Sequence, residues 1–403
     1  MAHSGGQIQA HGAVSAPTLQ RPTCTPMITT VPLPSWRELA TSLTGPMPND
    51  DDLARPWKRG TESAFWFSRA AWALKVLAIW WEGATGRKEP IVWLPDYFCN
   101  QSTLPLRDTG ARLIFYPVGP DLEPKWDACQ TLAEIEKPDL FVLVHYFGKS
   151  ADGTKARSFC DGVGAYLIED AAHVLGPADG IGGHGDFTFY SPYKIFPVPD
   201  GAVLLVRDRS VAEDVEAVVN ALPDAAPSPW QWRIKRFLQK IVPAPLLEKR
   251  ARTRRPNFKD DPPLAPIPAT PRLSAAARRM LATQGGRMAE IAAARKTHTD
   301  ALRAQIKSSP EGRPLLNSAE AGAAPYRFPL IYSDQERAAG LFNFLSEKGC
   351  PVETWPDLPP EVIAQPELHA DAIKLRRTMV FLPVHQSAEP DQLMECCSVD
   401  ELA

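Results

Sequence analysis

The sequence lacks three features that would place it in a specialised class of protein: an excess of basic charge, a long apolar run and paired cysteines. Its 44 Lys and Arg residues are balanced by 47 Asp and Glu residues, so we expect no nucleic-acid partner. The longest apolar helix-like run, residues 70–81, is too short to span a bilayer and contains Lys75. It therefore predicts a buried helix and no membrane partner.

Two further absences bear on the compartment. The first residues lack the charged-then-apolar order of a secretory signal. The seven cysteines are scattered and include no Cys-x-x-Cys pair, and the eight histidines show no metal-ligand spacing. This pattern argues against a disulfide framework or a zinc site. We therefore predict a cytoplasmic protein that binds no metal.

Proline is abundant instead, and it divides the chain. The 41 prolines are dense in residues 1–55, which we predict to be partly disordered, and in residues 222–271, a basic stretch that we interpret as a connector. Between them, residues 56–221 are expected to form a large α/β domain, and residues 272–403 a small C-terminal α+β domain.

Short apolar runs in the large domain predict its sheet. Most of them are apolar throughout, which is typical of strands that are buried on both faces, so we expect a mostly parallel sheet flanked by helices. The later runs are joined by short loops and could pair differently. The six runs are residues 91–94, 112–116, 140–144, 165–168, 187–190 and 202–206.

The C-terminal part shows a different pattern. Residues 273–306 are Ala-rich with helical periodicity, and Gly285–Gly286 is a predicted weak point in that helix. A strand at 326–332, a helix at 334–349 and a strand at 378–384 are expected to complete the small domain.

Polar side chains follow three of the predicted strands. His145 follows the run 140–144, Asp170 and His173 follow 165–168, and Lys194 with Ser191 follows 187–190. Ligands of parallel sheets bind beyond the carboxyl ends of the strands. We therefore expect these residues to converge at one edge of the sheet, although a lysine there can be an ordinary surface residue and Asp170 can simply cap a helix.

This set of side chains suits one chemistry in particular. A lysine in an apolar setting has a lowered pKa, so its neutral amine can attack a carbonyl and form a Schiff base. An aspartate at a strand end can keep a pyridine nitrogen protonated, which makes the ring an electron sink. Together they point to pyridoxal phosphate.

The motifs that carry these residues resemble a known family. "IEDAAHVLG" (168–176) followed by "SPYKIFPVPDGAVLLV" (191–206) is similar to the DegT/DnrJ/EryC1/StrS family of fold-type I pyridoxal-phosphate enzymes. Further matches are "SRAAWAL" (68–74), "WLPDYFCNQS" (93–102) and "VHYFG" (144–148), and the resemblance runs from about residue 60 to the end. It implies a fold-type I transferase in which residues 56–221 bind the cofactor.

The resemblance also implies roles for single residues. Lys194 would hold the cofactor as a Schiff base and shuttle a proton, Asp170 would pair with the ring nitrogen, and His173 would lie near the phenolic oxygen. These three are the predicted catalytic residues. The remaining cofactor contacts that it implies are Ser68, Arg69 and Ser191 on the phosphate, Tyr97 or Phe98 on the ring face, and His145, which could equally be a core histidine.

Several positions depart from the family pattern. The usual Gly-Thr after Ser68 is Arg69-Ala70, and Thr270 occupies the place of an asparagine that reaches the cofactor phosphate of a neighbouring subunit. Trp355 and His385 are interpreted as packing residues of the small domain.

The resemblance implies an aminotransferase of sugar biosynthesis, acting as a homodimer. It would move an amino group from an amino acid to a keto-sugar or related carbonyl compound. The alternatives are a pyridoxal-phosphate lyase or dehydratase and a regulatory homologue without turnover. Because Lys194 is present, the sequence lacks the lysine loss expected of the dehydratase branch.

Overall fold

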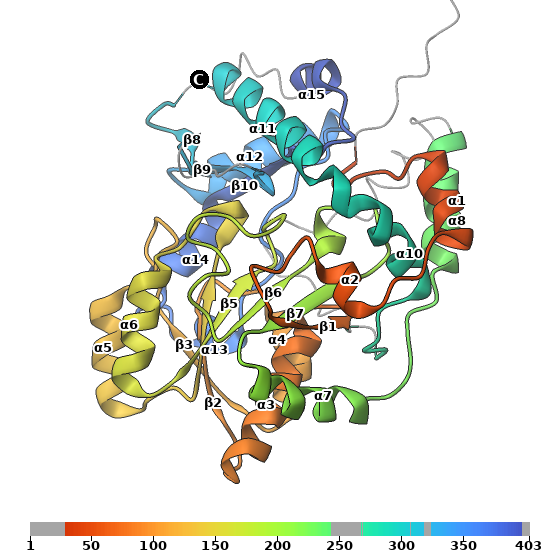
Figure 1. Cartoon of the computed structure of the whole chain (residues 1–403). Helices are drawn as coiled ribbons and strands as arrows, with labels where there is room; N and C mark the ends of the chain where they lie inside the picture. Colours follow the sequence, from red (N-terminus) through yellow and green to blue (C-terminus); the bar gives the residue numbers. More distant parts are fainter. Residues whose placement is uncertain (1–28, 243–266, 268, 307, 318–323, 397–403) are drawn as a thin grey trace, which may run out of the picture.

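The computed structural model describes residues 29–242, 267, 269–306, 308–317 and 324–396 (Figure 1). The disorder predicted for the first residues, and most of the basic stretch predicted within the connector, lie outside these residues. Among the described residues, no helix is long and apolar enough to cross a membrane.

A seven-stranded sheet organises the first half of the chain, in the order β1-β7-β6-β5-β4-β2-β3. Strand β7 pairs antiparallel with both of its neighbours, and all the other pairs are parallel. The mostly parallel sheet is thus confirmed, and β7 is the later run that pairs differently. The strands are β1 (Ser63–Phe67), β2 (Ile91–Pro95), β3 (Arg112–Tyr116), β4 (Leu140–Val144), β5 (Tyr166–Ala171), β6 (Phe187–Tyr190) and β7 (Ala202–Val206).

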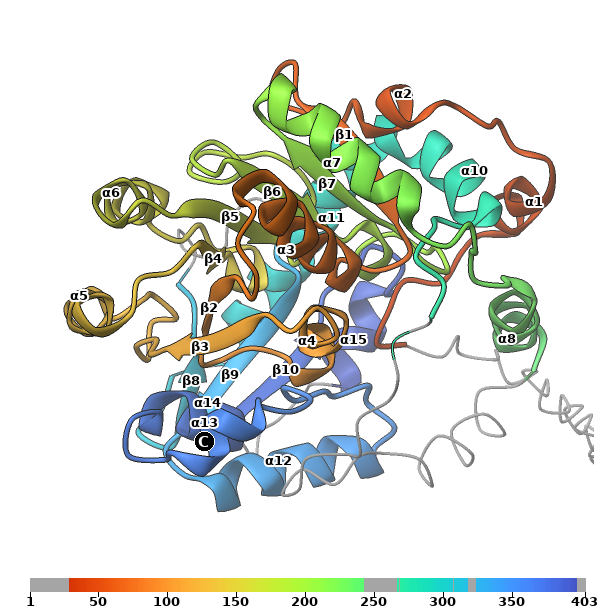
Figure 2. The same ribbon diagram turned by 90° about the horizontal axis from the view of Figure 1, so that it is seen from below.

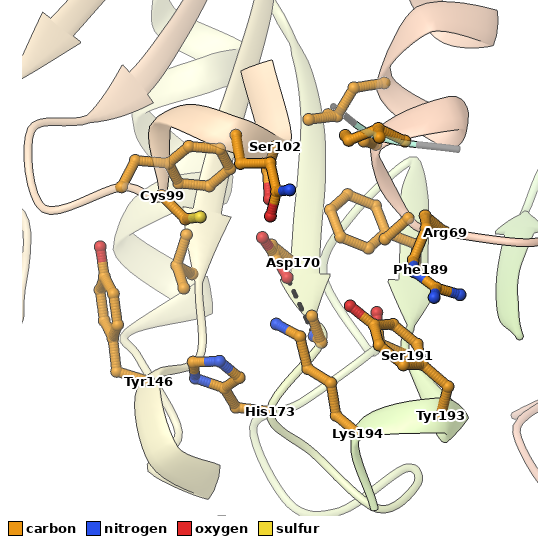
Figure 3. A pocket seen from close by; sticks show the side chains of 18 of the residues that line it. Arg69, Cys99, Ser102, Tyr146, Asp170, His173, Phe189, Ser191, Tyr193 and Lys194 are labelled. Atoms are coloured by element: carbon orange, nitrogen blue, oxygen red, sulfur yellow. Dashed lines mark hydrogen bonds between the residues drawn. The ribbon is translucent and has the colours of Figure 1, made fainter. Parts of the chain in front are cut away.

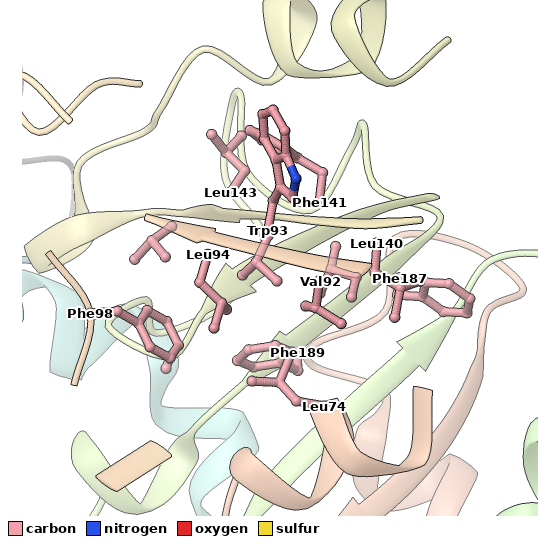
Figure 4. Packing of buried hydrophobic residues seen from close by; sticks show 14 of the residues in the cluster. Leu74, Val92, Trp93, Leu94, Phe98, Leu140, Phe141, Leu143, Phe187 and Phe189 are labelled. Atoms are coloured by element: carbon pink, nitrogen blue, oxygen red, sulfur yellow. The ribbon is translucent and has the colours of Figure 1, made fainter. Parts of the chain in front are cut away.

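Helices cover both faces of this sheet because its strands are apolar on both faces. Trp93 and Phe141 project to one side, where Phe141 lies 5.2 Å from the ring of Phe159 on α6. Val92 and Leu94 project to the other side, where α3 lies (Figure 4). The helices are α3 (Ala71–Thr85), α4 (Asn100–Arg107) and α7 (Arg209–Ala221) on one face, and α5 (Trp126–Ile135) and α6 (Gly153–Val163) on the other.

A second core lies against β1 and β7 and contains residues from two segments that are distant in the sequence, 53–57 and 273–291. Trp57 packs edge-on against Trp66 of β1 and against Phe196, at centroid distances of 5.5 and 6.0 Å. Ala277 and Met280 of α10 (Ala275–Gln284) belong to the same core. Helix α10 therefore packs on the large sheet, together with α1 (Trp36–Thr44) and α2 (Asp50–Ala54).

The long C-terminal helix is broken where two glycines occur. A 3-10 turn at Gly285–Arg287 separates α10 from α11 (Met288–Gln305). A Cβ atom at Gly285 would lie 2.7 Å from Cγ of Pro56, so the chain passes too close for a larger residue. The predicted weak point is therefore a real interruption.

The small domain is built on a three-stranded antiparallel sheet, β10-β9-β8. Its predicted strands and helix are confirmed, whereas β8 was not predicted. The scattered cysteines predict no disulfide framework, yet Cys350 is disulfide-bonded. The elements are β8 (Gly312–Pro314), β9 (Arg327–Tyr332), β10 (Met379–Pro383), α12 (Gln335–Glu347), α13 (Pro360–Ala364), α14 (Ala370–Thr378) and α15 (Pro390–Cys396).

Two residues between β9 and α14, Asp357 and Glu361, bind to the large domain. The Asp357 carboxylate accepts a hydrogen bond from the backbone N–H of Asn100 at 3.0 Å. Arg107 forms a bidentate ion pair with Glu361, at 2.6 and 2.9 Å. These contacts fix the position of Trp355, which precedes both residues and lies over the carboxyl edge of the large sheet.

Candidate active site

A pocket lies beyond the carboxyl ends of the parallel strands, where ligands of such sheets bind (Figure 3). Each contributing strand brings a side chain to it directly or through the following loop. Those side chains are Arg69 after β1, Phe98 after β2, Val144 on β4, Asp170 on β5, and Ser191 and Lys194 after β6.

Asp170 and Lys194 point toward one another across this pocket (Figure 3). Asp170 is 7% exposed, and one carboxylate oxygen accepts a hydrogen bond from the backbone N–H of Ala172 at 2.9 Å. The turn Pro192–Lys194 directs the lysine back over the end of β5. The two side chains come from neighbouring parallel strands, so the sheet fixes their separation.

The electrostatics of this pair differ from the expectation for Lys194. Burial lowers the pKa of Lys194, but Tyr193, Tyr326 and Asp170 raise it more, and the net shift is upward. The lowered pKa inferred from the apolar sequence is therefore wrong, because Tyr193, Tyr326 and Asp170 together outweigh the effect of burial on Lys194. Burial also raises the pKa of Asp170, against the opposing effect of the lysine charge.

His173 is held as a neutral imidazole beside this pair. Its Nδ1 accepts a hydrogen bond from the backbone N–H of Phe147 at 3.4 Å, so the ring proton belongs on Nε2. The ring is stacked on Tyr326, with centroids 4.4 Å apart and 13° between the planes. Burial, with the charges of Lys194 and Arg327, holds the pKa of His173 well below its ordinary value. His173 is therefore a hydrogen-bond donor at neutral pH.

The opposite side of the pocket is suited to an anion. The guanidinium of Arg69 lies 4.3 Å above the ring of Tyr193 and donates to the carbonyl of Ser68 at 2.7 Å. The fifteen-residue helix α3 begins beside it with no side-chain cap. The hydroxyl of Ser191 is fully buried, and among the described residues it has no hydrogen-bond partner. A cation, a helix N-terminus and an unsatisfied hydroxyl together favour a phosphate.

Three of the predicted site residues lie outside the pocket lining. The Ser68 hydroxyl donates to the carbonyl of Thr270 at 2.6 Å. Tyr97 stacks on Trp355 at 4.3 Å, whereas Phe98 lines the pocket. His145 is fully buried and forms a 2.9 Å contact with Glu169.

The pocket also contains residues that sequence reasoning missed. Trp355 lines the pocket and lies edge-on to His173 at 6.0 Å, although its sequence context indicated a packing residue. Tyr193, Tyr146 and Cys99 line it too. Of these, Tyr193 had a signal, because it directly precedes the lysine. Burial raises the pKa of Cys99 to about 12, so its thiol is not a nucleophile at neutral pH.

The arrangement fits the cofactor expected from the sequence. Arg69, Ser191 and the start of α3 could hold a phosphate, and the Asp170 carboxylate, which has no side-chain hydrogen bond within the described residues, could pair with a protonated ring nitrogen. Lys194 lies between the phosphate site and Asp170, so its amine could reach the aldehyde of a cofactor held there (Figure 3).

Comparison with known proteins agrees with this geometry. A sequence model of the DegT/DnrJ/EryC1/StrS aminotransferase family matches residues 133–396, about two thirds of the chain. A curated relative, serine hydroxymethyltransferase of Prochlorococcus marinus (strain MIT 9303), is 30% identical over 115 residues. That match spans 27% of this chain and 27% of the relative, so the relative shares only part of its length with this chain.

Solved structures share the fold over nearly the whole chain. The aminotransferase TlmJ from Streptoalloteichus hindustanus has a TM-score of 0.68 at 18% identity, covering 92% of this chain and 96% of its own. The Helicobacter pylori aminotransferase PseC, involved in pseudoaminic acid biosynthesis, has a TM-score of 0.68 at 12% identity, with coverages of 93% and 97%. Spr1654 from Streptococcus pneumoniae in its PLP-form has a TM-score of 0.67 at 15% identity, with coverages of 92% and 97%. At these identities the likeness establishes the fold.

Proposed function

Because the chain belongs to the DegT/DnrJ/EryC1/StrS aminotransferase family, we propose that it moves an amino group from an amino acid to a keto-sugar or a related carbonyl compound. It is a pyridoxal-phosphate-dependent aminotransferase of fold type I. The donor and acceptor are the proposed part. The observation that carries the proposal is the opposition of Lys194 and Asp170 in a pocket whose far side suits a phosphate.

The residues of the pocket divide the binding of pyridoxal phosphate among them. Arg69, Ser191 and the N-terminus of α3 are proposed to hold the phosphate, and Phe98 to cover one face of the ring. Asp170 would pair with the ring nitrogen. When bound, the cofactor supplies an aldehyde that condenses with primary amines and a ring that accepts electrons from the adjacent carbon.

Lys194 and His173 are the residues proposed to work beside the ring. The Lys194 amine would hold the aldehyde of the cofactor and, when free, would be the base that moves the proton of the donor Cα. The neutral His173 would donate its Nε2 proton to the phenolic oxygen. Trp355 lies over the pocket and would limit the access of water to Lys194.

The cellular setting is proposed from the same family membership. We propose a homodimer in the cytoplasm, with residues 56–221 as the cofactor-binding domain. Residues 272–403 would form the small domain, apart from α10, which packs on the large sheet. Residues 222–271 would connect the two. Tyr97 and His145 are proposed to support the site from behind, because their side chains contact Tyr146 of the pocket lining and Glu169 on β5. Ser68 is proposed to support it through its carbonyl, which accepts a hydrogen bond from Arg69.

A half-reaction distinguishes an aminotransferase from its rivals. When glutamate is added to the holoenzyme without any acceptor, one equivalent of keto acid should be released per bound cofactor. The yellow colour of the cofactor bound to Lys194 should be lost at the same time. A lyase would continue to turn over under these conditions, and a regulatory homologue would release no product. Either of those results would overturn the proposal.

A further inference from the structure

Helix α8 (Trp230–Ile241) is packed in an unusual orientation. Arg236 on this helix is only 9% exposed, whereas its neighbour Phe237 is 48% exposed. Trp232 packs toward the second core on the same inner side as Arg236. The helix thus turns Arg236 toward the protein and most of its large apolar side chains toward the solvent, with Gln231 and Lys235 exposed among them. A helix on the surface of a soluble protein usually has the reverse arrangement.

The outward side of α8 continues onto α1 and forms an apolar surface, which we call the α1/α8 face. The rings of Trp36 and Phe237 join the two helices at a centroid distance of 5.6 Å. Both views show α1 and α8 side by side at one edge of the molecule (Figures 1 and 2). An exposed apolar surface of this kind marks an interaction site. Its members are Trp230, Ile234, Phe237, Leu238 and Ile241 on α8, with Trp36 and Leu43 on α1.

The charges at the rim of this face are positive. Arg233 lies over the ring of Trp230 at 5.0 Å and also donates to Oγ and the carbonyl of Ser42 on α1 at 3.0 and 2.6 Å, and Lys240 lies over the ring of Trp36 at 5.3 Å. Within the described part of the chain, no carboxylate lies within 4.0 Å of either cation. Helix α8 contains no acidic residue, and the acid of α1, Glu38, is bound to Arg287 at 3.0 Å.

We propose that the α1/α8 face binds an anionic lipid surface. A helix with tryptophan, phenylalanine and leucine on one side and basic residues beside them lies in the headgroup region of a bilayer, with its apolar side in the acyl boundary. Trp36 and Trp230 would lie at headgroup level, and their cations would meet lipid phosphates. This contact is peripheral, and it requires no membrane-spanning segment.

A second copy of the chain fits the same face less well. A two-fold interface formed by this face would bring the basic residues of both copies into one interface. No acidic residue of α8 is available to compensate them. An anionic bilayer supplies both the missing charge and an apolar layer.

Co-sedimentation of the full-length holoenzyme with lipid vesicles tests the proposal. The protein should sediment with vesicles of phosphatidylcholine mixed with phosphatidylglycerol, less with phosphatidylcholine alone, and less as salt is added. Replacing Ile234 and Phe237 together by Glu should weaken binding to the mixed vesicles at least about tenfold, since apolar area is lost and like charge is added to the lipid charge. Lys240→Glu should weaken it through charge alone.

Ile135→Glu is the matched control, because Ile135 on α5 is 81% exposed and lies outside the face. It should bind like the unsubstituted protein. The cofactor absorbance and far-ultraviolet circular dichroism of each variant report folding. No binding to mixed vesicles, or equal losses in the control and the double variant, would overturn the proposal. So would a change of sedimentation coefficient from dimer to monomer in the double variant without lipid, since the face would then join two copies.

Discussion

Nε2 of His145 lies 2.9 Å from Oε2 of Glu169, and neither side chain is exposed. The backbone N–H of Ala151 donates to Nδ1 of the same ring at 3.1 Å, so Nε2 carries the proton and donates to the carboxylate. Glu169 precedes Asp170 on β5 and points to the opposite face of the sheet. His145 therefore braces the strand that presents Asp170, from outside the pocket.

Glu169→Gln should destabilise the protein by about 3 kcal/mol, because it removes the charge from a buried pair. The carboxylate also accepts backbone N–H groups of Gly182 and His184 at 2.6 and 2.7 Å, and an amide can replace only part of these bonds. Urea unfolding at neutral pH measures the difference. Glu134→Gln, at an exposed position on α5, is the control and should change stability by less than about 0.5 kcal/mol.

The same pair makes this difference pH-dependent. Burial alone would raise the pKa of Glu169, but His145 and the backbone donors lower it from 4.5 to about 2. A depressed folded-state pKa stabilises the protein above the unfolded-state value, and that contribution is lost as the pH falls toward 2. The gap between the unsubstituted protein and Glu169→Gln should therefore narrow below pH 4.5. A constant gap would contradict the assignment.

His385 should make stability fall in mild acid. Burial, with the charges of Arg295 and Arg327, lowers its pKa from 6.5 to about 3. The unfolded chain therefore takes up a proton as the pH falls below 6.5, whereas the folded chain does not, and stability is lost by about 1.4 kcal/mol per pH unit. Urea unfolding at several pH values measures this slope.

His385→Gln is the variant that tests this slope. Its amide can still donate to the Thr29 carbonyl, which His385 contacts at 2.6 Å. Between pH 6.5 and 5 the unsubstituted protein should lose about 2 kcal/mol more than the variant. The control His184→Gln, at a half-buried position, should keep the full slope. Equal slopes in all three proteins would show that His385 does not titrate on unfolding.

Arg69→Ala should weaken binding of pyridoxal phosphate by about ten- to a hundredfold, since charge-assisted hydrogen bonds to the phosphate are lost. Titration of the apoenzyme, followed by absorbance, measures the dissociation constant. Pyridoxal, which has no phosphate, should bind equally to both proteins. Arg55→Ala, at a side chain that is 79% exposed, is the control. If Arg69→Ala binds pyridoxal phosphate as tightly as the unsubstituted protein does, the phosphate is bound elsewhere.

Asp170→Asn should lower kcat by at least about a hundredfold, because the fixed negative charge opposite the ring nitrogen is removed. Steady-state kinetics with saturating cofactor measure the loss. Asp96→Asn serves as the control, because it removes a buried carboxylate that pairs with His369 at 3.0 Å outside the pocket. This change should lower stability and leave kcat per folded enzyme intact. A similar kcat for both variants would contradict the role of Asp170.

The sequence predicts the sheet well where strands are buried on both faces. The six predicted runs are strands, and the central parallel ones among them have the continuous apolar residues that are typical of such strands. Strand β1 was missed because its five residues run directly into the Ser68–Ala70 turn and α3, and its pairing with β7 is remote in sequence. Strand β8 contains Gly312 and Pro314, which disfavour strands, and it is a strand only because it pairs with β9.

The pocket was predictable as far as single strands determine it. Asp170 lies near the end of β5 and Lys194 follows the neighbouring strand β6, so their convergence follows from the parallel pairing of these strands. Trp355 lines the pocket only because the small domain docks on the large one through Asp357 and Glu361. No local sequence pattern indicates this docking. The pKa of Lys194 was mispredicted for a similar reason, since apolar neighbours are visible in the sequence whereas Tyr326 and Asp170, which raise this pKa together with Tyr193, face the lysine only in the folded chain.

Covalent labelling of Lys194 tests the central claim most directly. Holoenzyme treated with borohydride, digested and analysed by mass spectrometry should carry a stable pyridoxyl phosphate group on the peptide that contains Lys194. Lys194→Ala should carry none and should lose the yellow colour, while Lys149→Ala, at a lysine that pairs with Glu123 outside the pocket, should be labelled normally. A label on another lysine, or none in the unsubstituted protein, would contradict the account.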